Sequence, residues 1–215
     1  MKENEAALAP GSLQERKQRL VRANIAELAV VPLIEHGFDA VTIDDLAKAA
    51  GISKRTFFRY FATKEDVVTS EFTEAGTALL TALRLRPRDE QPLVSLRHAI
   101  GSVIERLTQD AERTRAVLRL IQRTPSLRGH FLVTQDQWRE QLAEVIAERL
   151  PPGPKTPMLA RLTATVSMGA VDAAITAWAQ SDDRDIGPVT DEAFDALTAV
   201  VTAAAPSEPG RKRSR

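Results

Sequence analysis

Residues 42–64, TIDDLAKAAGISKRTFFRYFATK, predict two short helices joined by a tight turn. Thr42 and Asp45 form a capping box, in which a hydroxyl and a carboxylate three positions apart accept hydrogen bonds from the backbone N–H groups that a helix start leaves unpaired. A helix is therefore expected to begin at Ile43. Gly51 follows at the position where a residue in the left-handed conformation usually ends a helix.

The second helix of the pair, residues 54–60, begins with two cations and has Ser53 in place to cap it. A short helix that follows another across a Gly turn fits the major groove of DNA, where its N-terminal residues meet base edges. This geometry predicts base contacts from Lys54, Arg55 and Thr56. A capped helix pair with surface cations is also typical of a solvated corner of a helical bundle, so the pattern alone leaves both interpretations open.

The residues of this stretch also resemble those of a known family. Residues 49–53, AAGIS, and 56–61, TFFRYF, resemble the TetR family of bacterial repressors, and the likeness extends back through residues 26–38. The resemblance implies a three-helix helix-turn-helix domain that binds DNA. The base contacts that it implies come from Lys54, Arg55 and Thr56, and the phosphate contacts from Thr42, Tyr60 and the amino end of the helix at Lys64. Phe58 stands where the family often has Tyr, so its ring can pack on a thymine methyl group or a sugar but cannot donate to a phosphate.

Composition excludes several classes of function. The 215 residues are 43% hydrophobic, 27% charged and 5% aromatic, and they include no Cys, which excludes disulfides, thiolate nucleophiles and Cys-ligated zinc. The formal net charge is zero, so any DNA contact must come from local patches. Because no apolar run reaches the ~18–20 residues of a membrane span and the N-terminus has no signal-peptide pattern, we expect a cytoplasmic protein.

Basic residues gather in three places: residues 16–22, residues 54–64 and residues 211–215. The first cluster predicts phosphate contact, with Lys17 as a candidate DNA-binding residue, and the alternative is a solvated helix face. For the terminal cluster, a disordered solubilising tail is the favoured interpretation.

The remaining chain shows helical periodicity and no strand-like alternation. Residues 13–36 form a long helix in which Pro32 should kink or fray the last turn, and Gly37 ends it. We expect its apolar residues, Leu20, Ala23, Ile25, Leu28, Val31 and Ile34, to pack on the next two helices. A capping box of Thr63 with Asp66 predicts a longer helix from Lys64. The expected fold is all-α, with a disordered segment at residues 1–12, a helix-turn-helix domain at 13–66, a helical ligand-binding and dimerisation domain at 67–204 and a basic disordered tail at 205–215.

No catalytic, metal-binding or cofactor motif is present, and the three His residues lack metal spacing. Bulky side chains on helices that should converge indicate a ligand pocket instead. The candidate pocket residues are Phe72, Leu118, Phe131, Trp138, Met168 and Trp178, and plain core packing is the alternative for at least half of them. Residues 111–150 are similar to a TetR subgroup suggested to bind acyl-CoA-like ligands, including regulators near mycofactocin genes. Candidate phosphate ligands there are Arg115, Arg119, Arg123 and Arg128.

Small and apolar residues dominate residues 158–180 and the last helix, and the family resemblance implies that these two helices form a four-helix dimer interface. The helix at residues 54–60, which is expected to contact base edges, is called the reader helix. Two reader helices related by a symmetry axis would bind half-sites ~34 Å, or a multiple of it, apart. The expected function is a dimeric, sequence-specific repressor that a small hydrophobic or acyl-CoA-like ligand releases from a palindromic operator, with no enzymatic activity. A helical acyl-ligand-binding protein without a DNA-binding role is the alternative.

Overall fold

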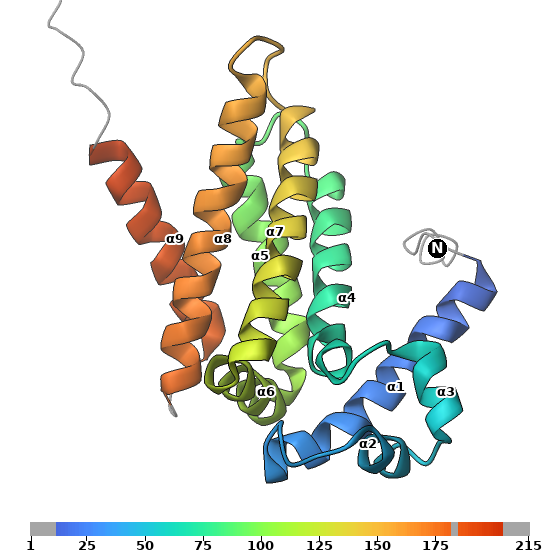
Figure 1. The fold of residues 1–215 in the computed structure, drawn as a ribbon. Coiled ribbons are helices and arrows are strands. Elements are labelled where there is room, and N and C mark those ends of the chain that lie inside the picture. Colours follow the sequence, from blue (N-terminus) through green and yellow to red (C-terminus); the bar gives the residue numbers. More distant parts are fainter. Residues whose placement is uncertain (1–11, 182–184, 204–215) are drawn as a thin grey trace, which may run out of the picture. The chain divides into compact units, whose positions relative to one another are not determined.

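The computed structural model describes residues 12–181 and 185–203, and every regular element in these ranges is a helix (Figure 1). The all-α fold class is therefore confirmed. The helices are α1 (Leu13–His36), α2 (Ile43–Ala49), α3 (Lys54–Tyr60), α4 (Lys64–Leu85), α5 (Pro92–Leu107), the 3-10 turn η1 (Thr108–Asp110), α6 (Ala111–Arg123), α7 (Pro125–Ala147), α8 (Thr156–Gln180) and α9 (Ile186–Ala203). The predicted basic tail, and nearly all of the predicted N-terminal segment, lie outside the described residues.

The helices group into two compact units that alternate along the chain. The first unit contains residues 1–76 and 112–134, and the second contains residues 77–111 and 135–215. Helices α4 and α7 each begin in the first unit and end in the second. These units follow packing, whereas the predicted boundary between residues 66 and 67 follows a sequence motif, so that boundary stays a prediction.

Helix α1 begins at a capping box of Ser12 and Glu15 and ends at Gly37, whose φ of 85° is the left-handed conformation that glycine adopts without strain. It continues through Pro32 to its predicted end. Its buried face consists of Ile25, Ala26, Ala29, Val30 and Leu33. The expectation that Leu20, Leu28 and Val31 pack against the neighbouring helices is wrong, because all three side chains are exposed.

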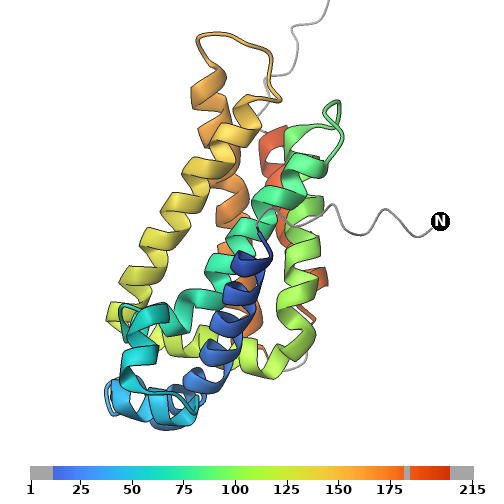
Figure 2. The same cartoon turned by 90° about the vertical axis from the view of Figure 1, so that its right-hand side faces the viewer.

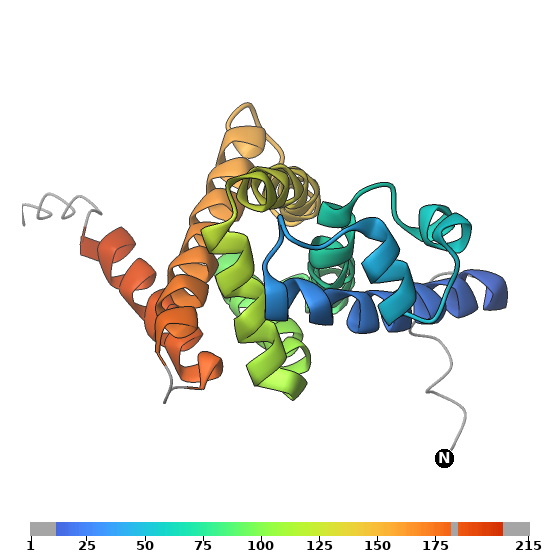
Figure 3. The same ribbon diagram turned by 60° about the horizontal axis from the view of Figure 1, so that its bottom comes forward.

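Helix α2 packs against α1 and α3 within the first unit, as Figure 3 shows. The predicted capping box is confirmed: Asp45 N–H donates to Thr42 Oγ1 at 3.3 Å, and Thr42 N–H donates to Asp45 Oδ2 at 2.9 Å. The Thr42 hydroxyl also donates to Asp45 Oδ2 at 2.6 Å, and this bond is the main reason that the pKa of Asp45 is lowered. Gly51 has a φ of 65°, which confirms the predicted left-handed turn between α2 and α3.

In the second unit, α8 lies along α9 and both contact α5 (Figure 2). Arg97 of α5 binds two carboxylates one turn apart on α9, with distances of 2.8 Å to Asp191 and 2.5 Å to Asp195. Helix α8 is long and apolar enough to cross a membrane by length and composition alone, with a hydropathy of 1.3 over its best window. Its buried residues include Ala164, Met168 and Trp178, and 39% of that window is buried.

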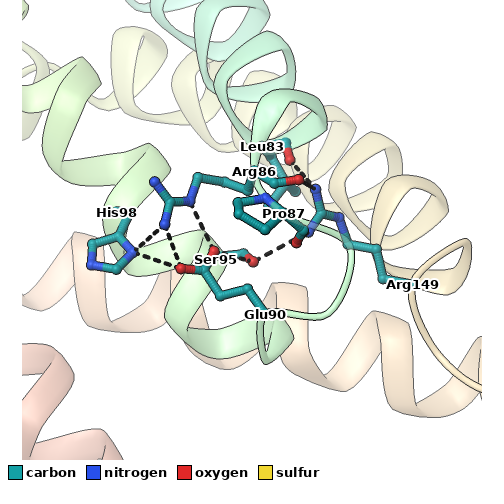
Figure 4. Close-up of polar contacts among 7 residues, drawn as sticks. All are labelled: Leu83, Arg86, Pro87, Glu90, Ser95, His98 and Arg149. Atoms are coloured by element: carbon teal, nitrogen blue, oxygen red, sulfur yellow. Dashed lines mark hydrogen bonds and ion pairs between the residues drawn. The ribbon is translucent and has the colours of Figure 1, made fainter.

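The C-terminal end of α4 is fixed by Arg149, which follows α7 (Figure 4). Its guanidinium donates to the carbonyl oxygens of Leu83, Arg86 and Pro87, the last two at 2.9 and 3.0 Å, and to Ser95 Oγ at 3.2 Å. A helix end leaves its last carbonyl groups without partners, and a cation there is favourable for the helix dipole as well. Arg149 therefore caps α4 from a position more than 60 residues away.

Glu90 holds the loop that joins α4 to α5, beside the Arg149 contacts (Figure 4). Its carboxylate accepts from Arg86 Nε at 2.8 Å and from Ser95 Oγ at 2.7 Å, and it lies 3.1 Å from His98 Nδ1. These bonds, with Arg86 the largest cause, lower the pKa of Glu90 to about 2. The sequence analysis did not predict this cluster, although Arg86 and Glu90 are four residues apart.

Candidate nucleic-acid interface

Helix α3 is anchored by aromatic rings that leave its other side exposed. Phe57 and Phe61 are buried, and their ring centroids lie 5.5 Å apart. The rings of Phe57 and Phe58 are nearly perpendicular with centroids 5.8 Å apart, yet the Phe58 side chain remains 49% exposed. Ser53 caps the helix by accepting from Thr56 N–H at 3.1 Å. The anchor therefore fixes which face of α3 is presented to solvent.

The predicted base-contacting residues lie in the first turn of α3. Lys54 and Arg55 are exposed, and Thr56 is half-buried. Lys54 Nζ lies 3.0 Å from Asp44 Oδ2 of α2, but both side chains are more than half exposed and such surface pairs contribute little. The Thr56 hydroxyl lies 2.9 Å from that of Ser53, so it is shared with the helix cap. Two exposed cations and an exposed ring thus form a surface that suits base edges in a major groove.

A basic groove of about 310 Å³ runs between the N-terminal half of α1 and the end of α3. Arg19, Arg22, Arg59 and Tyr60 line it, together with Glu15 and Gln18. Arg59 donates to Tyr60 Oη at 3.3 Å and lies 4.9 Å from the centre of that ring. The groove combines cations with a phenol hydroxyl, which are the groups that contact phosphate oxygens in protein–DNA complexes.

Arg22 has a structural role that the sequence did not reveal. Its guanidinium donates to the carbonyl oxygen of Tyr60 at the end of α3 and lies 4.3 Å from the centre of the Phe61 ring. It therefore ties α1 to the C-terminus of α3. Lys17 does not line the groove, and at 3.6 residues per turn it lies ~140° around α1 from Arg22. Of the basic residues in 16–22, Arg19 and Arg22 therefore line the groove, and Arg16 and Lys17 do not.

Lys64 likewise directs its ammonium group inward. Nζ donates to the carbonyl oxygens of Phe38 and Val41, both at 2.8 Å, and lies 4.3 Å from the centre of the Phe38 ring. The side chain thereby joins the start of α4 to the connection between α1 and α2. A phosphate contact at this position remains a prediction for the amino end of α4.

Asp66 organises the turn that follows α3. Its Oδ2 accepts from the N–H groups of Ala62 at 2.9 Å and Thr63 at 3.0 Å, and Asp66 N–H donates to Thr63 Oγ1 at 3.2 Å, which confirms the predicted capping box. Its Oδ1 lies 3.4 Å from His130 Nε2 of α7. Asp66 therefore connects the turn after the reader helix with α7, and the 64-residue separation of the pair explains why no local pattern indicated it.

The candidate pocket residues divide between the two units. Phe72 and Phe131 are buried in the first unit with ring centroids 5.3 Å apart, and Leu118 is buried in the same unit. The residues in the second unit are Trp138, which is half-buried, and Met168 and Trp178, which are buried. The structure brings Phe72 and Phe131 together, and a pocket formed by all six residues stays a prediction.

Comparison with known proteins matches an N-terminal and a C-terminal part of the chain to two protein families. Residues 25–70 match the family described as bacterial regulatory proteins, tetR family, and residues 90–202 match the MftR C-terminal domain. The chain is 33% identical over 146 residues to the HTH-type transcriptional regulator TcmR of Streptomyces glaucescens, an alignment that covers 65% of this chain and 64%, just under two thirds, of TcmR. It is 28% identical over 189 residues to the mycofactocin biosynthesis transcriptional regulator MftR of Mycobacterium tuberculosis, covering 86% and 92% of the two chains.

Solved structures show the same fold. A TetR-family transcriptional regulator from Syntrophomonas wolfei superposes with a TM-score of 0.60 at 14% sequence identity, over 88% of this chain and 97% of that one. At this level of identity the likeness concerns the arrangement of helices. It agrees with an N-terminal helix-turn-helix followed by a helical C-terminal domain.

Proposed function

Since the chain belongs to the TetR family of bacterial regulatory proteins and has an MftR-type C-terminal domain, we propose that it acts as a dimeric transcriptional repressor that binds a palindromic operator in the cytoplasm. The observation that supports this proposal most directly is the presentation of α3. Ser53 caps the helix, buried Phe57 anchors it, and the exposed cations Lys54 and Arg55 occupy its first turn. A zero net charge makes such a local surface necessary for DNA binding.

In this proposal the first turn of α3 enters the major groove. Arg55 has the fork geometry that recognises guanine O6 and N7, and Phe58 offers an exposed ring to a thymine methyl group. The phosphate contacts come from residues around α3: Thr42, Tyr60 and the amino end of α4 at Lys64. Arg19 and Arg59 add two cations beside Tyr60. Phosphate contacts of this kind position the protein, while the base contacts give sequence preference.

The proposed dimer interface is the outer face of α8 and α9. Met158, Leu159 and Leu162 of α8 and Val200 of α9 are large apolar side chains between 42% and 68% exposed. Gly169 lies on the exposed side of α8, and a Cβ atom there would meet nothing within 4 Å. An apolar face with a small residue near its middle suits close helix packing, and an isologous pairing would form a four-helix interface. A dimer places two reader helices on one symmetry axis, as a palindrome requires.

The proposed effector is a small hydrophobic molecule of the acyl-CoA type. The proposal of such an effector is supported by a buried, partly polar environment around α8 in the second unit. Met168 and Trp178 are buried there, and the hydroxyl of fully buried Ser167 has no hydrogen-bond partner among the described residues. A buried hydroxyl without a partner is costly, and a ligand oxygen could satisfy it. Effector release requires that the ligand bind one conformation better than the other, since equal affinity for both shifts nothing.

The test of the effector is a titration of saturated acyl-CoAs of increasing chain length into a preformed complex with operator DNA, followed by fluorescence anisotropy. We expect at least one chain length to release the DNA, with a coupling of ~1–3 kcal/mol, equivalent to a 5- to 150-fold change in operator affinity. Direct binding measured by calorimetry serves as the control. Acyl-CoAs that bind without changing operator affinity would contradict the proposed mechanism.

A further inference from the structure

Helix α1 has an apolar stripe on its solvent side, in addition to the apolar face that it buries. The stripe consists of Leu13, Leu20, Val21, Leu28 and Val31, whose side chains are between 41% and 71% exposed. At 3.6 residues per turn these five positions fall within a ~100° arc, opposite the centre of the buried face. No other described helix has as many exposed large apolar side chains.

A single exposed leucine needs no explanation, but an aligned row is characteristic of an interaction surface. The stripe extends over residues 13–31, or ~27 Å at 1.5 Å per residue. It is distinct from the basic groove, because none of its members lines that groove. Leu13, Leu20 and Val21 precede residues 25–70, which match the tetR family, and Leu28 and Val31 lie within them.

Charges along the stripe differ between its two halves. Arg16 and Lys17 lie in the N-terminal half, and Glu27 and Glu35 lie in or beyond the C-terminal half, all four exposed. A second α1 laid antiparallel against the first would bring each basic half against the acidic half of the other. A parallel arrangement would bring like charges together. The stripe is therefore self-complementary about a two-fold axis, as an isologous contact requires.

We propose that the α1 stripe binds the α1 stripe of a second copy of this chain, in antiparallel orientation, with Asn24 near the two-fold axis. With Asn24 at the centre, Leu20 lies opposite Leu28 of the other copy, and Lys17 lies opposite Val31, within side-chain reach of Glu27 and Glu35. A polar Asn at the centre of an apolar helix seam specifies register in helix pairs.

The size of the contact indicates where it acts. A helix face ~27 Å long and ~10 Å wide, contributed by two copies, buries less than the ~1,200 Å² typical of a stable interface. The contact is thus too weak to hold a dimer in dilute solution and forms where DNA brings two dimers to a high effective concentration. This step rests on the proposed function: the stripe makes binding to adjacent operators cooperative.

Cross-linking tests the contact without DNA, and the absence of Cys from the chain makes single-Cys variants unambiguous. In a concentrated solution with a mild oxidant, Asn24→Cys should accumulate a disulfide-linked pair. Leu20→Cys and Leu28→Cys should cross-link when mixed and much less when alone. Leu132→Cys, at an exposed leucine of α7 in the same unit, is the matched control. Equal cross-linking of Asn24→Cys and Leu132→Cys would overturn the contact. The same result is expected if residues of the same chain cover the stripe.

The role on DNA is tested with fragments that contain one or two adjacent operators. We expect the wild-type chain to bind the second operator about 10-fold or more tightly than the first, and Leu20→Glu to lose this factor while its affinity for one operator is unchanged. Leu132→Glu should retain it. Equal, independent binding to both operators by the wild-type chain would overturn the cooperative role. A chain that binds no operator at all would overturn the proposed function instead, and the cross-linking result would still decide the contact.

Discussion

Replacing Lys64 by Met separates two roles that this residue can have. The substitution keeps most of the side-chain stem and removes the ammonium group that donates to Phe38 and Val41 at 2.8 Å. A hydrogen bond from a charged group contributes ~1.5–3 kcal/mol when it is buried. Lys64 is half-buried, so we expect the two bonds and the contact with the Phe38 ring to contribute about 2–3 kcal/mol together.

The assay is urea unfolding of Lys64→Met beside Lys48→Met, which makes the same substitution at an exposed lysine of α2. The free energy of unfolding should fall by about 2–3 kcal/mol for Lys64→Met and by at most ~0.5 kcal/mol for Lys48→Met. The salt dependence of DNA binding should not change for Lys64→Met. Wild-type stability together with a salt slope reduced by about 0.9 would contradict a structural role for Lys64, because it would mean that the ammonium group contacts a phosphate.

Three further predictions concern other parts of the molecule. Arg55→Ala should weaken operator binding by ~1–3 kcal/mol and relax base preference at one position while leaving binding to random DNA nearly unchanged, as competition binding would show. The pKa of Glu90 is lowered, so the Glu90 carboxylate stabilises the fold at pH values above 4.5, the ordinary pKa of a Glu, and this contribution is lost as the pH falls toward about 2. Glu90→Gln should flatten that part of an acid-unfolding profile. An unchanged profile would contradict a stabilising role for the carboxylate. Leu162→Asp should convert the dimer to a monomer in sedimentation experiments and abolish binding to a palindrome, whereas a variant that stays dimeric would rule out the α8 face.

Local signals were sufficient to predict the helix-turn-helix. The capping box at Thr42, the cap at Ser53 and the left-handed glycines at 37 and 51 involve atoms within four residues of one another. Such contacts form in much the same way in any context, so the sequence predicts helix starts and ends directly. The all-α class follows from the helical periodicity of the apolar residues and is confirmed.

Long-range contacts could not be predicted in this way. Lys64 appears as a surface cation beside the reader helix, but its acceptors are 23 and 26 residues away in sequence. Arg149 likewise depends on elements that only folding brings together, because its acceptors are 54 to 66 residues away in sequence. Helix α1 is a different case: it is apolar on both sides, so its pattern does not define a single buried face. Leu20 and Leu28 could therefore not be distinguished from Ile25 by periodicity.

Selection of bound sequences from a random DNA library by the purified wild-type chain tests whether the protein is a dimeric regulator that reads DNA through α3. We predict recovery of a palindrome whose half-site centres are ~34 Å, or a multiple of it, apart, and loss of preference at one position of each half-site with Arg55→Ala. Recovery of no enriched sequence at moderate salt, or of a single half-site without symmetry, would contradict a dimeric regulator that reads DNA through α3.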